Sequence, residues 1–178
     1  MADVILISGS ASALSRSSGL IAHAQNAIAA RGHAAEIVSL KDLPAEDLLY
    51  ARYDSAAFAE AKQKVEAARA VVIATPVYKA AYTALLKAFL DILPQYGLRG
   101  KTVLPIASGG SQAHLLMIDY SLKPLLSVMG ATDLLSGIYA VDEQVKVAPS
   151  GEVWLHDDLR ERIDRGLDAL CARLGKAT

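Results

Sequence analysis

Residues 4–18 read VILISGSASALSRSS, an apolar run that leads through a glycine and a serine-rich turn into an amphipathic stretch. Similar apolar runs recur along the chain, and each alternates with a longer amphipathic stretch. Because a buried strand followed by an amphipathic helix is the repeating part of a βαβ unit, this pattern predicts alternating strands and helices. The expected strands are 4–8, 35–40, 70–75, 102–108 and 134–141. The expected helices are 14–30, 55–69, 83–93, 112–129 and 157–174.

The expected strands are rich in Val, Ile and Leu without clean alternation, which is typical of parallel strands covered on both faces. We therefore predict an α/β fold: a flavodoxin-like, doubly wound, five-stranded parallel sheet of order 2-1-3-4-5 with helices on both faces. A Rossmann half-domain is the alternative. No internal repeat, low-complexity segment or linker divides the chain, so residues 1–178 are expected to form a single domain.

The composition excludes several classes of protein. Among the 178 residues, 18 Lys and Arg stand against 19 Asp and Glu, and the net charge is −1. This balance lacks the basic surplus of a general nucleic-acid binder, so we expect neither nucleic acid nor a membrane as a partner. Cys171 is the sole cysteine, which excludes an internal disulfide and Cys-based metal centres, and no metal site is expected. Without a leader-like start or an apolar run of about 18 residues, the protein is expected to be cytoplasmic.

In the 2-1-3-4-5 order, a ligand lies beyond the carboxyl ends of the central strands, so the loops 9–13, 76–80 and 109–111 are the candidate site. These loops contain no Asp or Glu, whereas Asp142 and Glu143 follow an edge strand. Arg16 and Lys79 place cations at expected helix N-termini, where the helix dipole disfavours them by about 0.3–1 kcal/mol each. The pattern indicates a bound anion.

The loop after the first strand indicates which anion. Between residues 8 and 18 there are six serines, a glycine and one arginine, which suit the acceptor oxygens of a phosphate monoester. Helix capping is the alternative explanation for serines at this position. No G-x-G-x-x-G or G-x-x-x-x-G-K-[ST] motif is present, which disfavours a Rossmann dinucleotide site and a P-loop. The loop lacks the cysteine of a Cys-dependent phosphatase and the acids of a magnesium-binding receiver domain.

The other two loops consist largely of small residues. Pro76 stiffens a turn in which small residues flank Tyr78, and Gly109 and Gly110 would let backbone N–H groups reach a ligand edge. Tyrosine packing at a helix start and a tight glycine turn are the simpler alternatives. Together with the serine loop, this arrangement predicts a site for a flat heteroaromatic monophosphate, and FMN is the usual occupant of that crevice in this fold.

The sequence resembles the small NAD(P)H-dependent FMN reductases of the flavodoxin-like fold, most closely those of alkanesulfonate systems. The most specific matches are ATPVYKAAY at 74–82 and GGSQAHLLMIDYSLKP at 109–124. Weaker matches are SRSS at 15–18, EDLLYAR at 46–52 and GKTVLP at 100–105. The first loop of the family typically reads G-S-x-R, and here Ser12 stands in place of that arginine. We expect a weaker phosphate clamp, which Arg16 restores only in part.

The resemblance implies hydride transfer from NADPH or NADH to FMN, with no catalytic acid or base among the side chains. The residues implied at the phosphate are Ser10, Ser15, Arg16 and Ser17. Those implied along the isoalloxazine ring are Pro76, Val77, Tyr78, Lys79, Ser108, Gly109 and Gly110. It also implies a homodimer or homotetramer and a partner monooxygenase, of the alkanesulfonate type, that consumes reduced FMN. An FMN-retaining quinone or azo reductase and an electron-carrier flavodoxin are the alternatives.

Pro124 predicts a distortion in the expected helix 112–129. Proline cannot donate a hydrogen bond to the carbonyl of Tyr120, and its ring crowds that group, at a cost of about 3 kcal/mol in a regular helix. A bulge or kink at 119–123 is the expected relief. In the resembled reductases this helix lies at a subunit interface, so we expect the distorted turn to shape that interface and to help flavin exchange. A simple kink in a core helix is the alternative.

Overall fold

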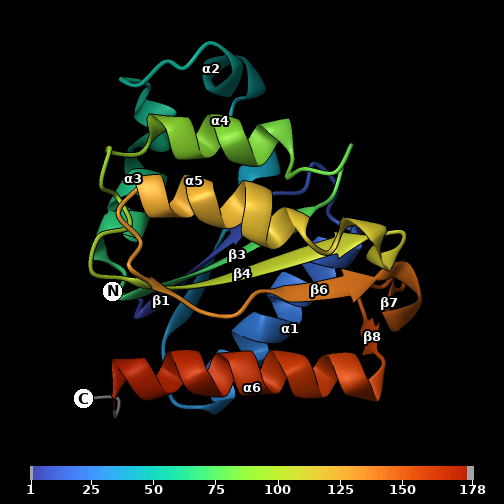
Figure 1. The fold of residues 1–178 in the computed structure, drawn as a ribbon. Helices are drawn as coiled ribbons and strands as arrows, with labels where there is room; N and C mark the ends of the chain where they lie inside the picture. Colours follow the sequence, from blue (N-terminus) through green and yellow to red (C-terminus); the bar gives the residue numbers. More distant parts are fainter. Residues whose placement is uncertain (1, 176–178) are drawn as a thin grey trace.

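The strands form a parallel sheet between two layers of helices in the computed structural model, which describes residues 2–175 (Figure 1). Its strand order is β2-β1-β3-β4-β5, and β6 also pairs with β4. This order confirms the predicted flavodoxin-like α/β fold. The strands are β1 (Val4–Ser8), β2 (Ala35–Ser39), β3 (Ala70–Pro76), β4 (Thr102–Gly109), β5 (Asp133–Leu134) and β6 (Ile138–Val141).

Each face of the sheet has its own apolar core. Successive residues of β1 point to opposite faces, so that Val4 and Leu6 join one core while Ile5 and Ile7 join the other. The first core packs against α1 (Arg16–Ala30) and α6 (Asp157–Leu174). The second packs against α3 (Ala59–Ala67), α4 (Ala84–Ile92) and α5 (Lys123–Val128). Burial on both faces explains why the strands lack polar alternation.

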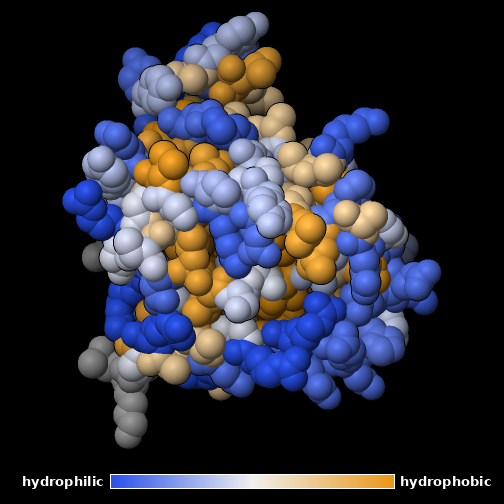
Figure 2. Space-filling view, viewed as in Figure 1, coloured by the Kyte–Doolittle hydropathy of each residue, from blue (hydrophilic) through white to orange (hydrophobic). Residues whose placement is uncertain are grey.

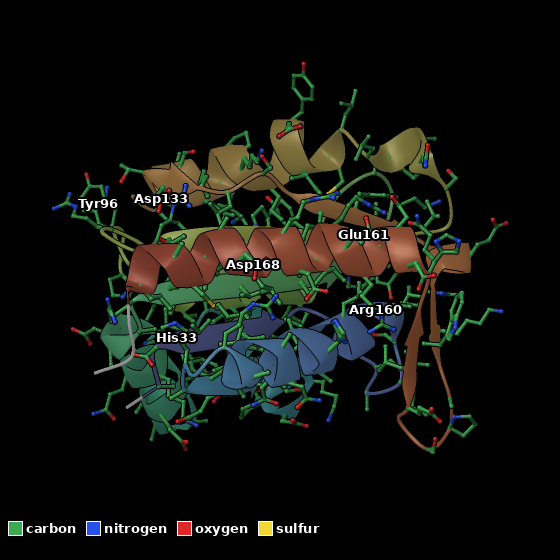
Figure 3. All side chains as sticks on the ribbon, turned by 90° about the horizontal axis from the view of Figure 1, so that it is seen from below. His33, Tyr96, Asp133, Arg160, Glu161 and Asp168 are labelled. Atoms are coloured by element: carbon green, nitrogen blue, oxygen red, sulfur yellow. The ribbon has the colours of Figure 1, made fainter. Side chains whose placement is uncertain are left out.

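Ion pairs join α1 to α6 at the edge of the first core. The Arg31 guanidinium, just past the end of α1, donates to Asp168 at 2.7 Å and to Asp164 at 3.1 Å. Asp168 lies on the side of α6 that faces α1 (Figure 3). These contacts hold the two helices in register beneath the strands whose ends form the site.

The fifth strand is split, and the prediction of one continuous strand over 134–141 is wrong. Leu134 pairs with Val103, the chain then leaves the sheet at 135–137, and Ile138 resumes pairing at Ile106. A Cβ at Gly137 would lie 2.4 Å from the side chain of Ile118, in the turn that precedes α5, so the chain passes too close to Ile118 to carry a side chain there without displacing it. A hollow of about 510 Å³ lies between this segment and α6, lined by apolar residues of 134–138 and by Arg162, Arg165 and Arg173. Figure 2 shows hydrophobic residues between α5 and α6, and hydrophilic residues over α6.

The helix expected at 112–129 is interrupted, as Pro124 predicts. It opens with a 3-10 turn at Gln112–His114, continues through a π-helical turn at Ile118–Leu122, and becomes regular only in α5. The Lys123 N–H donates to the carbonyl of Ile118, five residues earlier, instead of the residue four earlier. The distortion predicted around Tyr120 is therefore confirmed, because the chain accommodates Pro124 by widening the preceding turn.

Several shorter elements were not predicted. A helix, α2 (Ala45–Leu49), follows β2, and a hairpin of β7 (Val145–Val147) and β8 (Val153–Leu155) precedes α6. The hairpin packs on α1, where a Cβ at Gly19 would lie 2.7 Å from Val147. Three expected helices begin later than predicted, after Ser15, Phe58 and Thr83. Between residues 2 and 175, no helix has both the length and the apolar character needed to cross a membrane.

Candidate functional site

An open cavity of about 470 Å³ lies beyond the carboxyl ends of β3 and β4, beside the start of α1. The strand order reverses between β1 and β3, and that reversal separates the loops enough to leave a crevice. Two walls come from the predicted loops 76–80 and 109–111, whereas no residue of the predicted loop 9–13 lines the cavity. The serine-rich stretch contributes through Leu14–Arg16 at the start of α1, and the segment 142–147 adds a wall that was not predicted. The lining residues are Leu14, Ser15, Arg16, Pro76, Val77, Tyr78, Ser108, Gly109, Gly110, Asp142, Val145, Lys146 and Val147.

The serine loop is held by its own hydroxyl groups. Ser15 is the N-cap of α1, and its Oγ accepts the Ser18 N–H at 3.1 Å. Ser18 Oγ donates to the carbonyl of Ser12 at 2.8 Å, and Ser10 Oγ accepts the Ser12 N–H at 3.1 Å. Capping therefore accounts for Ser15, and the remaining bonds shape the loop ahead of any ligand.

Only part of the predicted phosphate set faces the cavity. Ser15 and Arg16 line it, whereas Ser10 and Ser17 are buried beneath it. Ser17 Oγ lies 3.1 Å from Ser15 Oγ, so Ser17 supports the N-cap residue from below. α1 has no acidic residue in its first turn, which leaves its N-terminal amides open to an anion from outside the helix.

The loop after β3 makes a tight turn. The Tyr78 N–H donates to the Ala81 carbonyl at 2.9 Å, and the Ala81 N–H donates back to Tyr78 at 3.1 Å. Lys79 and Ala80 between them have φ values of 51° and 62°, a left-handed conformation that costs non-glycine residues about 1 kcal/mol or more. The expectation that Lys79 lies at a helix N-terminus is wrong, because this turn and the N-cap Thr83 precede α4.

Hydrogen bonds fasten the three loops to one another. Thr83 Oγ1 donates to the Gly9 carbonyl at 2.7 Å, which joins the loop after β3 to the loop after β1. The Val77 N–H donates to the Ser108 carbonyl at 2.8 Å, which joins it to β4. The walls of the cavity are thus set before a ligand arrives, while the Tyr78 side chain stays 61% exposed at the mouth.

The glycine loop after β4 is backed by Tyr139 of β6. A Cβ at Gly109 would lie 2.4 Å from the Tyr139 phenolic oxygen, so any side chain there would have to displace the phenol. Burial, with a smaller contribution from the nearby Asp142 carboxylate, raises the pKa of Tyr139 above its usual range. The phenol therefore remains a hydrogen-bond donor across the physiological pH range.

One acidic side chain enters the site, against the expectation of a carboxylate-free mouth. Asp142 follows β6, and its Oδ2 lies 3.3 Å from Nη1 of Arg16. The register of β6 on β4 pairs Val141 with Gly109, which carries the next residue to the rim of the glycine loop. Strand order alone could not place it, because Asp142 was assigned to a loop after an edge strand.

The hairpin β7–β8 supplies the other wall that sequence reasoning missed. Val145 and Val147 line the cavity, and Lys146 adds a cation that also lies 5.3 Å from the centre of the Trp154 ring. A signal was present: V-K-V and V-W-L flank the segment A-P-S-G-E, which has the composition of a turn. Within residues 2–175, no group of three His, Cys, Asp or Glu side chains is placed to hold a metal ion.

Comparison with known proteins identifies the family to which the chain is similar. Residues 2–146 match the family model described as NADPH-dependent FMN reductase. The chain is 46% identical over 144 residues to an FMN reductase (NADPH) of Escherichia coli strain K12, covering 80% of this chain and 74% of that protein. It is 41% identical over 174 residues to an FMN reductase (NADPH) of Pseudomonas putida, covering 97% and 88%.

A solved structure extends the similarity to three dimensions. The apo form of an NADH:FMN oxidoreductase (EMOB) superposes with a TM-score of 0.85 at 36% sequence identity. The superposition covers 100% of this chain and 91% of that one. The similarity therefore includes β8 and α6, which lie beyond the residues matched by the family model.

Proposed function

This chain belongs to the NADPH-dependent FMN reductase family, and from that membership we propose that the cavity beyond β3 and β4 is where it binds FMN. The protein is an NAD(P)H:FMN oxidoreductase, as its sequence predicts, with FMN and NAD(P)H as its cofactors. The observation that carries the proposed site is the convergence of Ser15 and Arg16 with the loops at Pro76 and Gly109 on one cavity. We also propose that residues 1–178 act as one domain.

The residues present fit the two ends of an FMN molecule. Ser15, Arg16 and the N-terminus of α1 offer hydroxyl, guanidinium and amide donors for a phosphate. At the other end, Gly109 and Gly110 line the cavity without side chains, which lets their backbone approach the ring. Pro76, Val77, Tyr78 and Ser108 complete that wall for a flat ring. Ser10 and Ser17 support the phosphate loop from beneath, and Lys79 shapes the turn at the mouth.

Bound FMN supplies the hydride acceptor for the nicotinamide of NADPH or NADH. The chain's own residues bind FMN, orient its ring and polarise the ring edge. Backbone N–H groups of the loop Gly109–Ser111 are candidates to stabilise negative charge on the ring edge, and Tyr139 holds that loop in place. We assign no catalytic acid or base, because hydride transfer to a flavin needs none from the protein.

Self-association is the second part of the proposal. The segment around the π-helical turn exposes apolar side chains: Tyr120 is 80% exposed, Val128 is 72% exposed, and Leu115 and Leu116 are also exposed. Large apolar groups gathered on one segment are typical of an interaction surface. We propose that this segment contacts a second copy in a homodimer or homotetramer, and that the widened turn at Ile118–Leu122 shapes the contact and assists flavin exchange.

We further propose that reduced FMN leaves the site and serves a monooxygenase in the cytoplasm, of the kind that acts on alkanesulfonates. The support is the resemblance of residues 74–82 and 109–124, the openness of the cavity, and Ser12 in place of a phosphate-binding arginine. An FMN-retaining quinone reductase would instead need flavin to stay bound between turnovers.

The decisive experiment is a steady-state assay on protein first stripped of flavin. We expect NADPH or NADH oxidation that depends on added FMN, with both substrates entering before product leaves and free reduced FMN accumulating without oxygen. Retained flavin with ping-pong turnover of quinones would favour the quinone reductase. Absence of NAD(P)H oxidation without a partner reductase would favour an electron-carrier flavodoxin.

A further inference from the structure

The ion pair between Arg16 and Asp142 spans the mouth of the candidate flavin site. Arg16 is the first residue of α1, and Asp142 follows β6 on the other side of the cavity. Their side chains are 47% and 38% exposed, so the pair is solvated and both partners can rotate away from it. An ion pair this exposed contributes little to the stability of the fold, because water and salt screen the attraction between the two charges.

The Asp142 side chain makes no other polar contact that would stabilise the fold. Among residues 2–175, Arg16 is its one polar side-chain partner. The neighbouring turn is held by another residue, since Gln144 Oε1 accepts the Val141 N–H at 3.1 Å and Gln144 also contacts Arg162. The Asp142 carboxylate also faces the glycine loop, because a Cβ at Gly110 would lie 3.8 Å from Oδ2. The carboxylate thus contacts Arg16 and lies beside the glycine loop, two parts of the cavity lining that the proposed function assigns to FMN.

We propose that Asp142 is an internal competitor for the FMN phosphate: its carboxylate occupies Arg16 when the site is empty and must yield when flavin enters. The inference rests on the proposed function, since it assumes that Arg16 meets the phosphate. The Asp142 carboxylate and the FMN phosphate would both bind the Arg16 guanidinium, at the N-terminus of α1. After the exchange, the released carboxylate remains near a dianion and repels it. Asp142 therefore weakens flavin retention and favours release, as suits a protein that treats FMN as a substrate.

The test compares FMN with riboflavin, which has the same ring but no phosphate. Dissociation constants for both are measured by quenching of flavin fluorescence, on flavin-free wild type, Asp142→Asn and Glu143→Gln. Glu143 is the adjacent acid, is exposed, and does not line the cavity. For Asp142→Asn we expect the FMN dissociation constant to fall about three- to tenfold and the riboflavin constant to stay unchanged. For Glu143→Gln we expect neither to change.

A double-mutant cycle with Arg16→Gln tests the competition itself. In that background the Asp142→Asn substitution should tighten FMN clearly less than it does with Arg16 present, because the shared partner is gone. FMN release measured by stopped flow should also slow in Asp142→Asn.

Four results would overturn the proposal: weaker FMN binding in Asp142→Asn, equal tightening of FMN and riboflavin, equal tightening by Glu143→Gln, or an unchanged effect without Arg16. If wild type binds neither flavin, the proposed site itself fails. Thermal unfolding of each variant shows whether the fold is intact.

Discussion

The phenolic hydroxyl of Tyr139 donates a 2.8 Å hydrogen bond to the backbone carbonyl of Ser111. This bond ties β6 to the loop after β4, and the same oxygen fills the space that a side chain at Gly109 would need. The loop's backbone therefore faces the cavity in a fixed position, which is what backbone donors must have if they are to stabilise charge on a ligand.

The close approach of Gly109 and Tyr139 predicts that Tyr139→Phe restores part of the stability lost in Gly109→Ala. Gly109→Ala should lower the free energy of unfolding by about 1–3 kcal/mol, because the new methyl group meets the phenolic oxygen, and it should weaken FMN binding. Tyr139→Phe alone should cost about 0.5–1.5 kcal/mol through the lost hydrogen bond. The double variant should be more stable than Gly109→Ala, since the methyl group would then meet only the ring carbon at 3.4 Å. Urea unfolding measures the cycle, and strict additivity would contradict the clash.

The left-handed turn at Lys79 and Ala80 predicts that glycine is favourable at one position and unfavourable at the next. Ala80→Gly should raise the free energy of unfolding by about 0.5–1 kcal/mol, because the strain of φ 62° exceeds the entropic cost of glycine. Ala81→Gly is the matched control: its φ is not positive, so it should destabilise by about 0.5–1 kcal/mol. Chemical denaturation distinguishes the two. Destabilisation by both substitutions would show that the turn is unstrained.

The stability of the protein should fall in mild acid because of His23. Burial, and next the positive charge of Arg160, hold the pKa of His23 below its usual 6.5. Arg31 acts in the same direction, and Asp164 partly opposes them. When the pH falls through 6.5, His23 is protonated in the unfolded chain but not yet in the folded protein. Protonation therefore favours the unfolded state, and the free energy of unfolding decreases.

Unfolding in urea between pH 7.5 and 5.5 measures this dependence. In His23→Leu the slope should be smaller, because the buried imidazole is absent. His114→Gln, at an exposed histidine, serves as the matched control. Equal slopes in all three proteins would rule out His23 as the cause.

Tyr120 should govern self-association if the π-helical segment contacts a second copy. Tyr120→Asp places a charge where the proposed interface buries a ring, so we expect the dissociation constant between copies to rise at least about tenfold. Because the side chain is exposed, the free energy of unfolding of the monomer should change by less than about 0.5 kcal/mol.

Sedimentation velocity over a range of concentrations measures the association. Tyr53→Asp is the control, because Tyr53 is also exposed but lies in a different segment, between α2 and α3. An unchanged oligomer in Tyr120→Asp, or equal loss in both variants, would remove the interface from this segment.

Local patterns in the sequence were sufficient for much of the architecture. The strands β1, β3 and β4 could be predicted because burial along nearly the whole strand leaves a short apolar run, which can be read from a few neighbouring residues. Pro124 predicted the distorted turn at Ile118–Leu122 for the same reason, since the clash of its ring with a preceding carbonyl is a local event. The motifs at 74–82 and 109–124 carried the resemblance to the family that the comparisons support.

The sequence by itself thus determined the alternation of strands and helices, because hydrophobic periodicity is a local property. Together with the usual flavodoxin-like strand order, it predicted the loops at Pro76 and Gly109 that face the crevice. Only the tertiary structure decided the charge of the mouth. Asp142 meets Arg16 because the ladder between β6 and β4 sets Val141 against Gly109, and the break at Gly137 depends on its packing against Ile118. A register of that kind arises from hydrogen bonds between segments distant in the chain, and neither segment alone contains it.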